Sequence, residues 1–312
     1  MAFHSLEEIQ KSCREKNVLF WRAVLLEDMA DRSVTETESM QSMQQMWTAM
    51  KSASEQYDRT QVSASGLVGK MGAQMEEYRQ SKEPLCGPFV SKVIARALEM
   101  GESNACMKRI VAAPTAGACG VLPAVLVPLY EEERVSEDEV IHALYTAAGI
   151  GQVIASRAFI AGAAGGCQAE IGAASAMAAG ALVFLQGGDE EQISHGAAMA
   201  LKNLLGLVCD PVAGLVEVPC VKRNVIGAVN ALSSADMALA GITSRIPPDQ
   251  VIDAMKEVGE SMHVSLRETG EGGVANTPEA RKIKEKLGKI ALTLHKIIQE
   301  HSISQRNMES SI

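Results

Sequence analysis

Residues 171–185 read IGAASAMAAGALVFL, an apolar run near the middle of the chain that carries no charged side chain. Gly172, Ala176 and Gly180 are spaced four residues apart and therefore share one face of a helix. Because that face has no bulky side chain, a second helix can approach it closely. At 15 residues the run is shorter than the roughly 20 that a membrane-spanning helix needs. We therefore expect a helix buried in the core, and no association with a membrane.

Helix start signals recur on both sides of this run. A Ser or Thr followed three residues later by Glu is typical of a helix N-terminus. The chain has such pairs at Ser5 with Glu8, Thr35 with Glu38, and Ser136 with Glu139, and a further start at Thr277-Pro278-Glu279. Alternating strand patterns bounded by hairpin turns are not found. The sequence therefore predicts an all-α protein, a tightly packed helical domain with Gly/Ala-rich buried helices and cysteine-bearing loops.

The 312 residues are enough for about two domains. The composition changes near residue 105, where a block rich in Ala, Gly and Val begins. We therefore predict an N-terminal helical segment at residues 1–104 and a helical domain at residues 105–312, with one continuous domain as the alternative. Within the first segment, residues 1–80 are expected to form two helices and a glycine-bearing loop.

The charge balance excludes some partners. The formal net charge is −9, and no stretch is rich in Lys and Arg, whereas binding to nucleic acid needs a basic surplus or stripe. Residues 1–9 lack the basic start and apolar stretch of a signal peptide. We therefore expect no nucleic-acid partner, and a cytoplasmic protein whose seven cysteines are thiols rather than disulfides.

Three cysteines lie in glycine- or proline-containing stretches within otherwise apolar sequence: Cys167 in GGCQ, Cys209 in VCDP and Cys220 in VPCV. Glycine and proline interrupt helices and expose backbone amides that can donate to sulfur, which suits an iron–sulfur cluster. Structural zinc is disfavoured, because the chain has no Cys-x-x-Cys pair. Spacing alone leaves two interpretations open: a cluster site, or three small side chains that pack in the core.

A cluster held by three cysteines leaves one iron without a protein thiolate. Such an iron can act as a Lewis acid toward a substrate hydroxyl, which is catalysis rather than electron transfer. Loss of water from a β-hydroxy acid is the natural reaction for such a site, with a base removing the α-proton.

Five blocks of sequence resemble the α chain of the bacterial iron–sulfur-dependent L-serine dehydratases, also called L-serine ammonia-lyases. They are APTAG at 113–117, GGCQAEIG at 165–172, GLVCDPVAGLVEVPCVKRN at 206–224, ADMALAGI at 235–242 and LRETG at 266–270. The blocks are long, keep their order and fall within about residues 84–280, so a chance match is excluded.

The resemblance implies a catalytic α subunit that converts L-serine to pyruvate and ammonia. It implies an oxygen-labile [4Fe-4S] cluster held by Cys167, Cys209 and Cys220, and no pyridoxal phosphate. It also implies a separate β chain as partner and a helical fold, with residues 105–312 as the cluster-binding catalytic domain. Pyruvate formation would serve amino-acid degradation or gluconeogenesis.

The residues near these motifs offer candidates for substrate binding. Arg223 and Asn224 follow the third cysteine closely, and Thr115 lies in the Pro-Thr-Ala-Gly stretch. A guanidinium is suited to a bidentate contact with the substrate carboxylate. The alternative is that Arg223 is a structural arginine paired with an acid, such as Asp210 or Glu217.

The general base is not assigned to a residue of this chain. Among its six histidines, His263 is the best placed by sequence, but the Ser-His-Thr-type motif of the family belongs to the β part. We therefore expect the β chain to supply the base. Cys86 and Cys119 stand where the family often has Ser or another small residue, and their role is left open.

Two other functions remain as alternatives. The same scaffold would suit an L-cysteine desulfidase, which the release of sulfide distinguishes from a serine ammonia-lyase. The chain would otherwise be a cluster-carrying structural subunit whose chemistry lies in a partner chain. Loss of the cluster with retained activity of the complex would favour that alternative.

Overall fold

The computed structural model describes residues 3–289, and this part of the chain is built from helices and loops without a named β-strand. The α-helices are α1 (Leu6–Lys16), α2 (Phe20–Arg32), α3 (Glu36–Glu55), α4 (Met71–Ser81), α5 (Gly87–Ala105), α6 (Val121–Glu131), α7 (Glu137–Arg157), the single turn α8 (Gly162–Gly165), α9 (Ala173–Leu185), α10 (Glu190–Lys202), α11 (Cys220–Leu239) and α12 (Pro248–Ser261). Short helices are η1 (Ala116–Ala118), η2 (Gln168–Gly172), η3 (Val212–Gly214), η4 (Val264–Leu266) and η5 (Gly273–Asn276). Residues 278–289 are helical as well. The prediction of an all-α fold is confirmed.

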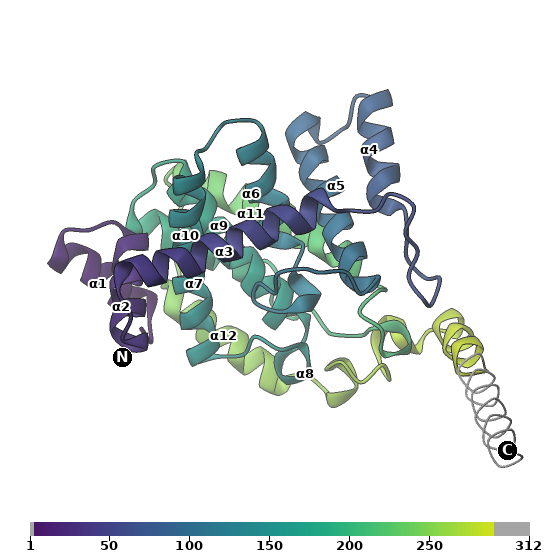
Figure 1. The fold of residues 1–312 in the computed structure, drawn as a ribbon. Helices are drawn as coiled ribbons and strands as arrows, with labels where there is room; N and C mark the ends of the chain where they lie inside the picture. Colours follow the sequence, from purple (N-terminus) through teal and green to yellow (C-terminus); the bar gives the residue numbers. More distant parts are fainter. Residues whose placement is uncertain (1–2, 290–312) are drawn as a thin grey trace, which may run out of the picture.

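The apolar run at 171–185 forms the centre of the bundle as η2 and α9. Helix α9 packs against α6, α7, α10 and α11 (Figure 1). A Cβ atom added at Gly180 would lie 2.1 Å from Ile150 Cδ1 on α7, so any larger residue there would force the Ile150 side chain to move. By length and hydropathy, Gln168–Leu185 is the one span of the described residues suited to crossing a membrane, yet 83% of it is buried inside the protein. Burial of this degree is typical of a core helix.

The predicted caps start helices where expected. Thr35 and Ser136 form complete capping boxes at α3 and α7, in which each side chain of the pair bonds the backbone of the other residue. At α1 the box is half formed, because Ser5 accepts from the Glu8 amide while the Glu8 carboxylate takes the backbone N–H of His4. Local sequence therefore fixes these helix starts.

The prediction of two helices within residues 1–80 is wrong, since this region contains α1 to α4. Asn17, with φ 50°, caps the C-terminus of α1, and Ser33, with φ 53°, caps the C-terminus of α2. Both residues adopt the left-handed conformation that usually calls for glycine. The two helix ends therefore lack the glycine or proline that would have revealed them in the sequence.

One hydrophobic cluster crosses the composition change near residue 105. It joins Trp47 and Val93 from the N-terminal side to Val125, Leu129 and Ile150 from the other side. Helix α3 lies across this cluster and contacts α5, α6 and α7 (Figure 1). A shared core favours the alternative of one continuous domain, and the division at residue 105 stays a prediction.

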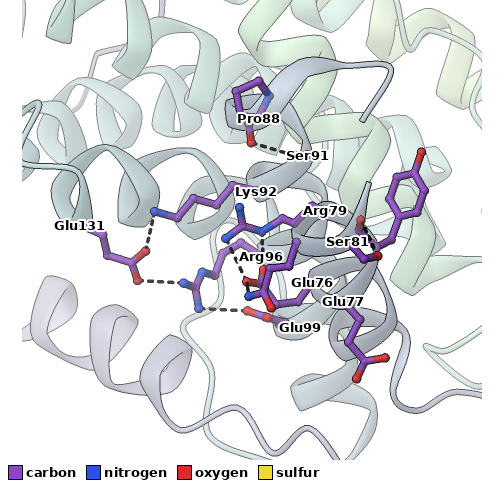
Figure 2. A network of polar contacts seen from close by, with 12 residues as sticks. Glu76, Glu77, Arg79, Ser81, Pro88, Ser91, Lys92, Arg96, Glu99 and Glu131 are labelled. Carbon is purple, nitrogen blue, oxygen red and sulfur yellow. Dashed lines mark hydrogen bonds and ion pairs between the residues drawn. The ribbon is translucent and has the colours of Figure 1, made fainter. Parts of the chain in front are cut away.

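A polar network joins α5 to the end of α6. Figure 2 shows Arg96 between two carboxylates, with Nη1 3.0 Å from Glu99 Oε2 and Nη2 2.8 Å from Glu131 Oε1. Lys92 Nζ lies 3.2 Å from the other oxygen of Glu131. Burial raises the pKa of Glu99 to about 7 in spite of Arg96. The network fixes α5 beside α6 and leaves Glu99 as a group that titrates near neutral pH.

Candidate active site

Backbone hydrogen bonds bring the first two cysteine-bearing segments together. The Gln168 amide donates to Leu207 O at 2.9 Å, and the Gly206 amide donates to the Gln168 side-chain oxygen at 2.9 Å. Gly166 precedes Cys167 with φ 77°, a conformation that disfavours any other residue. These contacts fix Cys167 beside the segment that carries Cys209.

A second set of contacts fixes Cys209 and Cys220. The Cys209 amide donates to Leu266 O at 2.8 Å, and the Glu268 amide donates to Cys209 O at 2.7 Å. The loop after Cys209 closes on itself through Val212 N–H to Val218 O at 2.9 Å, just before Cys220 begins α11. The exposed fractions of Cys167, Cys209 and Cys220 are 3%, 3% and 8%.

The three thiols influence one another. A hydrogen bond from Cys209 lowers the pKa of Cys167 despite burial, and the nearby Arg223 guanidinium lowers it further. The same hydrogen bond, followed by burial, raises the pKa of Cys209. Burial and the charge on Cys167 raise the pKa of Cys220 to about 12. The structure thus brings together the three cysteines that the sequence singled out.

Arg223 is held by the cysteine-bearing loop itself. Its Nη1 donates to Val208 O at 2.7 Å, and its Nη2 donates to Asp210 Oδ1 at 2.8 Å. Asp210 also accepts from the Val274 amide at 2.6 Å. Glu217, the other acid considered for this arginine, instead accepts from two serine hydroxyls, Ser63 at 2.8 Å and Ser65 at 2.5 Å. The structural alternative for Arg223, a pair with Asp210, is therefore present, and its role toward substrate stays a prediction.

Asn224 has its amide committed to the backbone. It accepts from the Gly120 N–H at 2.8 Å and donates to Gly117 O at 2.9 Å and Cys220 O at 3.1 Å. These bonds tie η1 to the start of α11. The arrangement makes Asn224 a positioning residue, and no amide hydrogen points freely to a substrate.

Thr115 contacts an acid that sequence reasoning missed. Its hydroxyl donates to Glu170 Oε1 at 2.7 Å. Glu170 lies in η2, a π-helical turn of a kind that is frequent at functional sites. Burial raises the pKa of Glu170, and Glu268 raises it further. The signal in the sequence was an acid three residues after Cys167 in an otherwise apolar stretch.

Other residues named from the sequence lie apart from these contacts. The His263 side chain is exposed, and its Nδ1 lies 2.8 Å from Ser265 Oγ, so its assignment as a base stays untested. Cys86 is exposed. The buried Cys119 thiol donates to Met100 O at 3.6 Å, and burial raises its pKa to about 12. Cys119 is therefore a protonated, packed thiol.

Arg267 is a further residue that sequence reasoning missed. It is paired with Cys209 in a parallel bridge. Its Nε is buried and has no hydrogen-bond partner in the part of the chain that the structure describes. A buried guanidinium nitrogen without an acceptor costs free energy, so Arg267 belongs among the candidate site residues.

The three cysteines provide a donor set of the kind that iron–sulfur clusters use. Within residues 3–289, no group of three His, Cys, Asp or Glu side chains is arranged to hold one metal ion. The donor set of three buried thiols, with Arg223 to balance thiolate charge, suits such a cluster.

Comparison with known proteins agrees with the motifs. Residues 12–275 match the family model described as serine dehydratase alpha chain. The probable L-serine dehydratase α chain of Bacillus subtilis is 45% identical over 285 residues, which cover 91% of this chain and 95% of that one. The L-serine dehydratase α chain of Peptoniphilus asaccharolyticus is 43% identical over 282 residues, covering 90% and 97%. L-serine dehydratase TdcG of Escherichia coli is 35% identical over 283 residues, covering 88% of this chain and 61% of that protein. The chain belongs to the serine dehydratase α-chain family.

Proposed function

We propose that this chain is the catalytic α subunit of an L-serine ammonia-lyase, and that Cys167, Cys209 and Cys220 hold a [4Fe-4S] cluster. The observation that carries the proposal is the convergence of three buried thiols from three separate segments, within the motifs shared with the family. The names of the relatives supply the substrate and the reaction.

The reaction removes the α-proton and the β-hydroxyl of L-serine as water, and the aminoacrylate that remains hydrolyses to pyruvate and ammonia. When bound, the cluster supplies an iron without a protein thiolate, which can polarise the leaving hydroxyl. The chain itself supplies the thiolates, and Arg223 stabilises their negative charge at Cys167. The apolar helices around the loops limit the access of water, which strengthens these electrostatic contacts. A base on a β chain would remove the α-proton.

A separate β chain is part of the proposal. The relatives of similar length are named as α chains, while the Escherichia coli relative is longer and is matched over 61% of its length. We propose that the additional segment of such longer relatives has the function of the β chain. We also place the complex in the cytoplasm, in serine degradation or gluconeogenesis, and expect the open iron to make it oxygen-sensitive.

The first test is metal analysis of the chain purified without oxygen. Wild type should contain about four irons and four acid-labile sulfides per chain. Cys167→Ser should lose them, while Cys86→Ser, at an exposed cysteine elsewhere, should retain them. Wild-type chain without iron after reconstitution in the presence of a β chain would refute the cluster.

The second test is the assay of the complex with a β chain. L-Serine should yield pyruvate and ammonia, and Cys167→Ser should abolish the reaction. Release of sulfide from L-cysteine with little turnover of L-serine would show a desulfidase instead. Full activity of the Cys167→Ser complex would show that the chemistry lies in the partner.

A further inference from the structure

The carboxylate of Glu170 lies directly beside Cys209. A Cβ atom added at Gly162 would be 2.8 Å from Glu170 Oε2 and 2.9 Å from Cys209 Sγ. A Cβ added at Gly117 would lie 3.1 Å from the other carboxylate oxygen, Oε1. The carboxylate therefore faces two glycines, and it flanks, together with a proposed cluster ligand, a small space that any larger residue at 162 would fill.

One oxygen of this carboxylate is fixed and the other is open. Oε1 accepts the Thr115 hydroxyl at 2.7 Å. For Oε2, the described residues provide no hydrogen bond, and they provide no ion pair to Glu170. Arg223 is committed to Asp210 and to a backbone carbonyl. A partly buried carboxylate without a cation is costly, so the arrangement suits a cationic ligand group at Oε2.

We propose that Glu170 binds the α-ammonium group of the amino-acid substrate and so selects 2-amino acids over acids that lack the amino group. The inference rests on the proposed function, because L-serine is what brings an ammonium group to this space. Thr115 is then a positioning residue, since its hydroxyl holds Oε1 and turns Oε2 toward Gly162 and Cys209. With its amino group fixed at Glu170, the rest of the amino acid is directed toward the cysteines.

The test compares two ligands that differ by the ammonium group. L-Alanine has the ammonium and carboxylate of serine but no leaving hydroxyl, so it binds without reacting, and propionate lacks the ammonium. Their dissociation constants are measured by calorimetry on the complex with the β chain, for wild type, Glu170→Gln and Glu260→Gln. Glutamine keeps the shape of Glu170 and an oxygen that can accept from Thr115. Glu260 is exposed on α12 and serves as a matched control for loss of one negative charge.

Glu170→Gln should raise the dissociation constant of L-alanine by about 10- to 100-fold, the range expected for loss of one charge-assisted hydrogen bond. The same variant should change the dissociation constant of propionate by less than about twofold. The KM for L-serine should rise together with the dissociation constant of L-alanine. Glu260→Gln should change neither ligand, and iron content should match wild type in both variants.

The outcomes separate this inference from the proposed function. Equal weakening of both ligands in Glu170→Gln, or no weakening of L-alanine, overturns the inference even if the wild-type complex converts serine. Wild-type binding that does not distinguish L-alanine from propionate also overturns it. A wild-type complex that forms no pyruvate, yet binds L-alanine in a Glu170-dependent way, refutes the reaction and leaves the ammonium site standing.

Discussion

The close contact between α9 and α7 makes Gly180→Ala a direct test of the core. The new methyl group would lie 2.1 Å from Ile150 Cδ1 and 3.4 Å from Ile193 Cγ2. Overpacking of this kind costs about 1–3 kcal/mol, while alanine in place of glycine in a helix interior returns about 1 kcal/mol. We expect a net loss of about 0–2 kcal/mol in the free energy of unfolding, measured by urea titration with far-UV circular dichroism.

The variant Ile150→Val removes the Cδ1 atom that meets the new methyl group. Alone it should cost about 1 kcal/mol. Combined with Gly180→Ala it should bring stability to within about 1 kcal/mol of wild type, a favourable coupling of about 2 kcal/mol. Gly172→Ala is the matched control, because its nearest neighbour is Leu201 Cδ1 at 3.3 Å, and it should add to Ile150→Val without coupling. Additive behaviour of Gly180→Ala with Ile150→Val would refute the reasoning.

Three further variants test the contacts around the site and the polar network. Asn224→Ala should lower the free energy of unfolding by about 3 kcal/mol, because it removes the acceptor of the buried Gly120 N–H and the amide that donates to Gly117 O and Cys220 O; a loss below about 1 kcal/mol in urea titration would contradict the positioning role. Asp210→Asn should lower the free energy of unfolding by about 3 kcal/mol in the same assay, since it breaks the buried ion pair with Arg223; an unchanged midpoint would contradict it. Burial raises the pKa of Glu99 from 4.5 to about 7, so the folded state binds its proton more tightly than the unfolded state. The contribution of Glu99 to the free energy of unfolding should therefore fall by about 3 kcal/mol as the pH rises from about 4.5 to above 7. Glu99→Gln should remove this fall, as urea titrations at about pH 5 and about pH 8 would show.

The fold class follows from local patterns that the structure leaves intact. The apolar run at 171–185 is buried because it has no polar face to offer to water, and Thr35 and Ser136 begin helices because their side chains satisfy free amides. The number of helices near the N-terminus does not follow in the same way. Asn17 and Ser33 end helices in the left-handed backbone conformation, which their residue types do not predict.

Some features of the site can likewise be predicted from local sequence, and others depend on contacts between distant segments. The cysteines are visible in the sequence because glycine and proline surround them, and the pair of Arg223 with Asp210 spans 13 residues of one motif. Glu170 is different, since its partner Thr115 is 55 residues away and its open space depends on Gly162. Such a relation exists only once the helices have packed, so no spacing rule reveals it.

The two arginines at this site show how the geometry changes the ranking of candidates for a carboxylate. Sequence reasoning selects Arg223 because it closely follows a proposed cluster ligand, but two of its nitrogens are taken by Asp210 and Val208. Residues paired in a parallel bridge project their side chains to the same face, so Arg267 leaves the backbone on the same side as the Cys209 thiol. Its Nε is buried and lacks an acceptor among the residues described, whereas Arg223 donates twice. A carboxylate that approaches Cys209 can therefore satisfy the buried Nε of Arg267, whereas two of the N–H groups of Arg223 already have acceptors.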